Sequence, residues 1–462
     1  MVTITLGASL FMFNVFKSKS RLGGSVFVAF ARVVGIGNTF LISMFLARVV
    51  TKNEFAAISL LMNTIIIASI AARFGFDRLL MRHIAESLAH DEAARLLSYV
   101  RNLAGMAIVS TVVVCLASGF VLYFVDRYYG LDVTTTLLIL TMASLATMSF
   151  LHLACESLRG YQALAISTIC DAQRSGPLLN LCFSFLLMGI GFFCHFNAES
   201  VFSAFLASQL VVLLFAIVFL ARKLRRTSAI AATFCGSELR PVPSKSRLAK
   251  SAAGIAGSEM LAGCLGFGDL WIAGVMLPPE QVATWVVANQ LAQVVSLPYT
   301  IAILTAIPQI PKFFIRRDLK GLEDMLRSSA TMSTIVSLLP VLLLVCIPTT
   351  VLSLSYGNAF ADAAIPIAIL CLGKLAVVST GQCGACLIFC GHERILLMIN
   401  ILSAITYVIA GILSARTFGI IGLAATITTV TIVTNLLYLF AVRRLIGIWT
   451  SVRLLRPKTG HL

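Results

Sequence analysis

Four ionisable side chains lie inside long apolar stretches of the sequence: Arg32, Glu259, Asp269 and Lys374. A charged group within a membrane helix is costly, so it faces a helix-bundle interior, a partner group or a water-filled cavity. The guanidinium of Arg32 can bind two phosphate oxygens at once, and Lys374 offers a second cation. The carboxyl groups suit a coupling proton or a coupling cation. These residues predict either a transport cavity for a phosphate-bearing substrate or a structural ion pair.

Both acids lie in the stretch 251–277, which we expect to form the inner wall of that cavity. A helix of this length would extend about 39 Å, enough to cross a bilayer with some tilt. Glycines in such a helix let neighbouring backbones approach or let the helix bend. The stretch contains Gly254, Gly257, Gly263, Gly266, Gly268 and Gly274.

Three amide side chains, Asn289, Gln290 and Gln293, follow in the next apolar stretch. They are expected either to line the cavity or to form hydrogen bonds between helices. The sequence contains no glycine-rich phosphate loop followed by lysine, which argues against ATP hydrolysis by this chain.

Three cysteines, Cys383, Cys386 and Cys390, recur at helical spacing near the end of one apolar stretch. A zinc site would need a fourth ligand, and His392 is the nearby candidate. Small cysteine side chains also pack well in apolar surroundings. We favour packing, and we expect no metal and no cofactor.

Composition predicts an all-α, polytopic membrane protein. Of the 462 residues, 59% are hydrophobic and 12% are charged, and the mean hydropathy is +0.97. Soluble domains carry about 25% charged residues, and the alternating ten-residue segments of a β-barrel are not seen. A 20-residue window predicts twelve transmembrane helices. They cover roughly 23–46, 55–72, 103–124, 133–154, 169–193, 199–221, 252–277, 282–306, 329–350, 359–380, 393–414 and 419–441.

Most of the 35 lysines and arginines fall on one side of these predicted spans. Such an asymmetry places the basic segments, and with them both termini, in the cytoplasm. The net charge of +16 then complements the anionic lipids of the inner leaflet, so no nucleic-acid partner is expected. The opposite side carries only Arg48, Lys52, Arg127 and Arg416.

A basic linker, 222–250, divides the chain into an N-terminal lobe, 1–221, and a C-terminal lobe, 251–462, of six spans each. The lobes align weakly at a shift of about 226 residues, which places Arg32 opposite Ser258, next to Glu259. Equal span numbers in the two lobes predict a parallel repeat. Residues 76–101 alternate apolar and charged side chains, as expected of an amphipathic helix on the inner surface.

The order of several short motifs resembles that of polysaccharide or O-antigen lipid flippases (Wzx-type) of the multidrug/oligosaccharidyl-lipid/polysaccharide exporter superfamily. The likeness covers about residues 20–445. The motifs are Phe74-Gly75-Phe76-Asp77-Arg78 with Arg82, Leu158-Arg159-Gly160, Asp269-Leu270-Trp271-Ile272-Ala273, Ile307-Pro308 with Pro311, Tyr356-Gly357-Asn358-Ala359-Phe360 and Gly419-Ile420-Ile421-Gly422-Leu423-Ala424-Ala425.

This resemblance implies a V-shaped pair of six-helix lobes in the bacterial inner membrane. It also implies a flippase that moves undecaprenyl-diphosphate-linked oligosaccharide to the outer leaflet for O-antigen, exopolysaccharide or capsule synthesis. Expected partners are the lipid-linked oligosaccharide, membrane lipids, a coupling proton or sodium ion, a polysaccharide polymerase and a chain-length regulator.

Two other functions remain open at the level of sequence. A multidrug or cation antiporter of the same superfamily would favour a cavity dominated by acids, whereas this chain places Arg32 and Lys374 among them. A membrane-bound polysaccharide polymerase or ligase would need a large outer loop with catalytic residues. The predicted outer loops are short, so we do not expect an enzyme.

Overall fold

The computed structural model describes residues 21–453, except 90–92, 130–133, 172–175, 194–195, 234–244 and 308. Nearly all of these described residues are helical, and none of them forms a strand. The all-α prediction is therefore confirmed. The chain divides into two compact units, residues 1–263 and residues 264–462, with the boundary inside one long helix.

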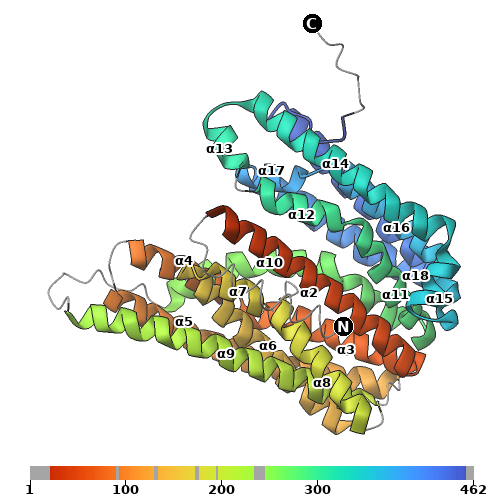
Figure 1. Ribbon diagram of the computed structural model, residues 1–462, viewed down its shortest axis with the longest axis horizontal. Helices are drawn as coiled ribbons and strands as arrows, with labels where there is room; N and C mark the ends of the chain where they lie inside the picture. Colours follow the sequence, from red (N-terminus) through yellow and green to blue (C-terminus); the bar gives the residue numbers. More distant parts are fainter. Residues whose placement is uncertain are drawn as a thin grey trace, which may run out of the picture. The chain divides into compact units, whose positions relative to one another are not determined.

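Unit 1 is a bundle in which α6 occupies the middle. This helix packs against α3, α4, α5 and α9, and α9 also packs against α8 (Figure 1). The helices of unit 1 are α2 (Arg21–Val49), α3 (Lys52–Arg73), α4 (Phe76–Ala89), α5 (Ala93–Tyr129), α6 (Thr135–Gly160), α7 (Leu164–Cys170), α8 (Pro177–Phe193), α9 (Ala198–Thr233) and the first part of α10 (Lys245–Met276).

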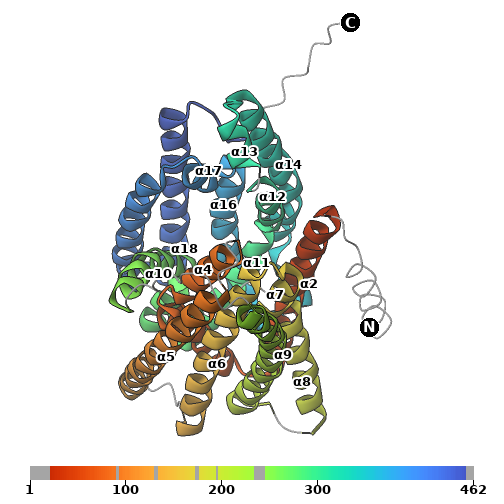
Figure 2. The same cartoon turned by 90° about the vertical axis from the view of Figure 1, so that its left-hand side faces the viewer.

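Unit 2 is organised around α16 (Ala364–Thr380), which packs against α11, α14 and α18 (Figure 2). Its other helices are the end of α10, α11 (Pro279–Val295), α12 (Leu297–Ala306), α13 (Ile310–Ile315), α14 (Leu319–Cys346), α15 (Pro348–Ser355), the 3-10 helix η2 (Asn358–Ala363), α17 (Cys383–Phe389) and α18 (Glu393–Leu445).

The helices that reach membrane-spanning length are compatible with the twelve predicted spans. Among the described residues, nine helices are long and apolar enough to cross a bilayer, and α11 with α12 adds one span bent by 52°. The apolar helix α8 is shorter. The 53-residue α18 is broken at Gly419, where φ is 59° and ψ is −144°, so it covers both predicted spans of this region.

Two predicted spans differ in detail from the structure. The predicted span 169–193 is divided into α7 and α8, because the chain leaves the helix at Asp171 and Pro177 begins the next one. Pro is favoured in the first turn of a helix, where its missing N–H is not needed. The fourth span extends past its predicted end at residue 154 to Gly160, so α6 contains ionisable residues that the prediction left outside.

A tight turn brings α4 directly after α3. Thr51 and Glu54 form a capping box at the start of α3, and the helix ends at Phe74 in a left-handed conformation with φ 47°. Gly75 follows with φ 73°, and a Cβ there would lie 2.7 Å from the backbone oxygen of Ala252. Glycine is needed at this position because both its conformation and its close approach to α10 exclude a side chain. Asp77 follows in the first turn of α4.

The predicted amphipathic helix is present, but it ends at Ala89, and α5 begins at Ala93. Leu79, Leu80 and Ile84 are buried on one face of α4. Arg82 and Glu86 lie on the exposed face and form an ion pair of 2.7 Å. The buried face packs against α5 and α6, so α4 is a structural part of unit 1.

The predicted linker 222–250 is helical where the structure describes it. Helix α9 continues to Thr233, and α10 begins at Lys245. The intervening residues 234–244 lie outside the described part of the chain. The division into lobes at 1–221 and 251–462 stays a prediction.

Candidate functional site

A buried carboxylate forms the centre of the polar site in unit 2. Asp269 on α10 is 6% exposed. Its Oδ2 accepts a hydrogen bond of 2.6 Å from Asn289 Nδ2 and one of 3.2 Å from Trp285 Nε1, both on α11. Hydrogen bonds to a carboxylate compensate part of the free energy lost on burial of its charge. Asp269 is therefore held in a fixed position by α11.

A cavity of about 70 Å³ lies next to Asp269. Asn289, Gln293 and Lys374 line it together with Asp269, and Tyr407, Thr428 and Thr431 from α18 complete its polar wall. Each water needs roughly 10–15 Å³ of such volume, so the cavity has room for a few waters or for a small ion with part of its hydration shell.

Lys374 faces Asp269 across this cavity. The two charges attract each other electrostatically, yet within the described residues Lys374 makes no direct ion pair or hydrogen bond. A lysine ammonium is a compact, strongly hydrated charge on a flexible stem. The Lys374 ammonium is thus available to an anionic group that enters the cavity.

Gln290 is separated from this cavity by its position on α11. Its Oε1 accepts a hydrogen bond of 2.9 Å from the hydroxyl of Tyr356, which is 1% exposed. Gln290 therefore joins α11 to the end of α15, as the interhelical alternative anticipated. Of the three amide residues, Asn289 and Gln293 line the cavity and Gln290 does not.

Glu259, the other acid of α10, lies in unit 1 and pairs with α4. Its Oε1 is 2.7 Å from Arg78 Nε, and Arg78 Nη1 lies 3.6 Å from Glu156 Oε2 on α6. Arg78 thus links α10 to α6 through two carboxylates. Burial alone would lower the pKa of Arg78, but the charge of Glu156 and the hydrogen bond to Glu259 outweigh it and raise the pKa.

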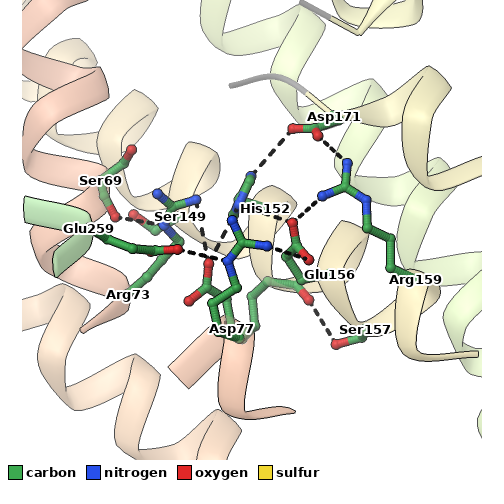
Figure 3. Close-up of polar contacts among 12 residues, drawn as sticks. Ser69, Arg73, Asp77, Ser149, His152, Glu156, Ser157, Arg159, Asp171 and Glu259 are labelled. Carbon is green, nitrogen blue, oxygen red and sulfur yellow. Dashed lines mark hydrogen bonds and ion pairs between the residues drawn. The ribbon is translucent and has the colours of Figure 1, made fainter. Parts of the chain in front are cut away.

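His152 on α6 lies at the centre of this charge network (Figure 3). Its Nε2 is 3.5 Å from Asp77 Oδ2 and 3.6 Å from Glu156 Oε1, and its Nδ1 is 3.4 Å from Asp171 Oδ1. Arg159 also pairs with both Glu156 and Asp171. The ion pairs of Arg159, together with the three carboxylates around the His152 ring, hold α4, α6 and the end of α7 together.

Arg73 completes the network at the end of α3. Its Nε donates a hydrogen bond of 3.1 Å to the carbonyl of Ser69, and its Nη1 lies 3.8 Å from Asp77 Oδ2. Asp77 is fully buried, and burial raises the pKa of its carboxyl against the opposing effect of Arg73. We call the eight residues the unit 1 charge network: Arg73, Asp77, Arg78, His152, Glu156, Arg159, Asp171 and Glu259.

Arg32 on α2 feels the charges of this network without an ion pair to any described member of it. Its charge is attracted by Asp171 and repelled by Arg159, and its buried Nε has no hydrogen-bond partner among the described residues. The next turns of α2 are also polar: Asn180 on α8 donates hydrogen bonds to the Gly35 carbonyl and to the Thr39 hydroxyl. Arg32 therefore retains hydrogen-bonding capacity for another group.

The sequence prediction missed most of the unit 1 charge network. It named four ionisable residues inside spans, whereas α6 also carries His152 and Glu156. Their spacing of four residues, with Arg159 three further on, places all three side chains on neighbouring positions of one helix face. This spacing was the available signal.

The cysteines of α17 pack in an apolar cluster. Cys383, Cys386 and Cys390 are buried together with Leu322, Leu326 and Leu387. Cys386 Sγ and Cys390 Sγ are 3.9 Å apart, and Cys383 Sγ is 2.9 Å from the hydroxyl of Thr450. In the described part of the chain, no group of three or more His, Cys, Asp and Glu residues has a metal-binding arrangement.

Comparison with known proteins decides the family. A family model described as polysaccharide biosynthesis protein matches residues 23–314, more than half of the chain. The chain belongs to this family. Curated proteins give no match. From residue 23 onward, the match to the polysaccharide biosynthesis protein family extends over all of unit 1, including Arg32 and the charge network, and over Asp269 and Asn289 in unit 2.

Solved structures with the same fold are MATE transporters. An inward-facing multidrug resistance MATE transporter of the MOP superfamily is 15% identical, with a TM-score of 0.63 over 92% of this chain and 98% of that chain. A mutant of the Vibrio cholerae MATE transporter VcmN is 16% identical, with a TM-score of 0.59 over 91% and 97%. At this identity the likeness shows the fold. This member of the polysaccharide biosynthesis protein family is thus a multi-span membrane protein with a MATE-like transporter fold.

Proposed function

We propose that this protein is a flippase that moves undecaprenyl-diphosphate-linked oligosaccharide across the bacterial cytoplasmic membrane for surface polysaccharide synthesis. The match to polysaccharide biosynthesis proteins carries the proposal. The MATE-like fold supports transport rather than catalysis as the contribution of the chain to that process. The glycan could be an O-antigen, an exopolysaccharide or a capsule unit.

Two cations are proposed to contact the diphosphate. Lys374 lines a polar cavity without an ion pair, and the buried Nε of Arg32 has no hydrogen-bond partner among the described residues. A buried cation without an ion-pair partner gains more binding free energy from a phosphate than a cation already paired with a carboxylate, because the cost of its desolvation is not yet offset. These two cations lie in different units, Arg32 in unit 1 and Lys374 in unit 2.

Asp269 and Glu259 are proposed to respond to a coupling proton or sodium ion. Asp269 shares its cavity with Asn289 and Gln293, whose oxygens are ligands for hard cations. Glu259 pairs with Arg78 on α4, so an ion that binds at this acid would act on that pair. In the proposed alternating-access cycle, the sugar-diphosphate head group crosses through polar surroundings while the isoprenoid tail stays in the bilayer. This route avoids moving charge through hydrocarbon.

A complementation experiment tests the proposal. In a strain that lacks the gene, we expect the unaltered protein to restore surface polysaccharide. Arg32→Ala and Lys374→Ala are expected to fail while accumulating lipid-linked oligosaccharide, with normal amounts of folded protein in the membrane. Arg247→Ala, an exposed basic residue of α10, is the matched control. Normal export by both the Arg32 and Lys374 variants would remove these cations from the mechanism.

The alternative function is a multidrug or cation antiporter. The solved structures that share the fold favour it, since those proteins are multidrug transporters. The same deletion strain separates the two functions. Increased susceptibility to cationic drugs with intact surface polysaccharide would support the antiporter, whereas loss of polysaccharide with unchanged susceptibility would support the flippase.

Further parts of the proposal concern location and partners. The excess of basic residues on one side of the spans supports cytoplasmic termini. A polysaccharide polymerase and a chain-length regulator are the proposed partners that act on the exported unit. Membrane lipids and the coupling ion are the remaining partners.

A further inference from the structure

An open groove lies on unit 1 between α5 and the turn that joins α3 to α4. Its volume is about 770 Å³, within the 300–1,000 Å³ typical of sites for small molecules. The turn contributes Phe74 and Phe76, and Phe74 holds the left-handed conformation described above. The wall formed by α5 consists of Arg101, Asn102, Gly105, Met106, Val109 and Ser110.

The groove follows one face of α5 and has a defined length. Its α5 residues recur at intervals of three and four, which is the repeat of a single helix face. From Arg101 to Ser110 the helix rises about 13 Å. This length is close to half of the roughly 30 Å hydrocarbon core, that is, to one leaflet of a bilayer.

Chemistry changes along the groove from charged to apolar. Arg101, at one end, is exposed and makes no hydrogen bond or ion pair with any described residue. Phe74, Phe76, Met106 and Val109 supply apolar surface along the remainder. A free cation at the level of the headgroups and an apolar channel below it match the two parts of a phospholipid.

The groove continues into the membrane-facing surface of α5. Val109 is 64% exposed, and Val113, Leu116 and Phe120 remain 59–71% exposed further along the same helix. An apolar chain in the groove would thus stay in contact with the bilayer and would exchange with it without crossing a polar barrier.

We propose that this groove binds one anionic phospholipid of the adjacent leaflet, with its phosphate at Arg101 and one acyl chain along α5. The length matches one acyl chain of a phospholipid, and the cation at its end matches the phosphate. The site lies on residues that the proposed transport mechanism does not use, so the inference goes beyond the proposed function.

Gly105 is the residue that keeps the groove open. No atom lies within 4 Å of a Cβ built at this position, so a larger side chain would fill the groove without displacing the backbone. Gly189 on α8 is also exposed with no atom within 4 Å, and it lies beside Phe185 and Met188, which are 77% and 56% exposed. It provides a matched control on another apolar surface of the same unit.

Native mass spectrometry of the purified full-length protein tests the proposal. The probes are phosphatidylglycerol and phosphatidylcholine with identical acyl chains, added at increasing concentration. The unaltered protein is expected to retain one phosphatidylglycerol more tightly than phosphatidylcholine. Arg101→Gln should weaken phosphatidylglycerol binding about fivefold, as expected for one interfacial charge, and leave phosphatidylcholine binding unchanged. Gly105→Leu should weaken the binding of both lipids.

Two control variants separate the groove from general effects. Arg247→Gln removes one exposed basic residue elsewhere on unit 1, and Gly189→Leu adds the same side chain to α8. Both are expected to bind phosphatidylglycerol like the unaltered protein. Equal binding by Arg101→Gln and the unaltered protein would overturn the proposal, as would equal losses in Gly105→Leu and Gly189→Leu. Thermal unfolding of each variant in detergent shows whether a loss of binding reflects loss of the fold.

Discussion

Arg78 and Glu259 are 181 positions apart in the sequence, yet their side chains meet at 2.7 Å between Arg78 Nε and Glu259 Oε1. This pair joins α4, the short amphipathic helix, to α10, which carries both acids of the proposed coupling site. Glu259 is consequently not an isolated charge in unit 1.

Breaking this pair should destabilise unit 1. The side chains of Arg78 and Glu259 are 30% and 22% exposed. The pair is therefore partly buried, and its contribution to stability should be intermediate between those of exposed and fully buried ion pairs. We expect Glu259→Gln to lower the free energy of unfolding by about 1–2 kcal/mol. Thermal unfolding in detergent measures the effect. The matched control is Arg82→Gln, whose exposed pair with Glu86 should contribute about 0.5 kcal/mol or less. Equal effects of the two variants would contradict the proposed role of Arg78.

Removal of a hydrogen bond to Asp269 should also lower stability. Asn289→Ala deprives the buried carboxylate of its shorter side-chain hydrogen bond and leaves the longer one from Trp285, at an expected cost of about 1–3 kcal/mol. The control is Asn435→Ala, because Asn435 donates to the Thr431 carbonyl within its own helix. Unchanged unfolding of the Asn289 variant would show that water replaces the lost donor.

Gly160 should not tolerate a methyl group. A Cβ at this position would lie 2.8 Å from the Cβ of Ile84 and 2.8 Å from the carbonyl oxygen of Met81, both on α4. Gly160→Ala is expected to destabilise the protein by about 1–3 kcal/mol through overpacking. Gly189→Ala, in open surroundings, should be neutral or stabilising, because alanine favours the helix by about 1 kcal/mol relative to glycine. The opposite order of melting temperatures would contradict the close packing of α4 on α6.

The stability of the protein should depend on pH through Asp77. Burial, opposed by Arg73, raises the pKa of this carboxyl in the folded state. The folded protein therefore binds the proton more tightly than the unfolded chain, whose pKa is about 4. The stabilisation from this group is fully present below about pH 4 and is lost as the pH rises through the folded pKa.

Comparison with Asp77→Asn measures this dependence. We expect the melting temperature of the unaltered protein, relative to the variant, to fall as the pH rises from about 4 to about 7. Asp324→Asn, at an exposed carboxyl paired with Arg453, controls for the loss of a negative charge. A relative melting temperature that rises with pH would mean that attraction by Arg73 outweighs burial.

The sequence alone determined the helical, membrane-spanning class and the family resemblance. In lipid, the backbone N–H and C=O groups of long apolar stretches must form hydrogen bonds within the protein, and a helix achieves this within a single segment. The sequence also determined that α4 is amphipathic, since its apolar side chains recur on one face. It singled out Asp269 and Lys374 because ionisable groups are rare in such stretches, and the structure places both around one cavity.

Only the tertiary structure decided which charges are neutralised by partners. Glu259 meets Arg78, and Gln290 meets Tyr356, through helices that are distant in sequence. The packing of α4 and of the end of α7 against α6 is what brings Asp77 and Asp171 next to His152. Hydropathy indicates the free-energy cost of placing a charged side chain in an apolar helix. That cost is offset by partner side chains within a few ångströms, and the fold decides which residues these are. The periodicity of the sequence identifies neighbours on one helix but not partners on another helix.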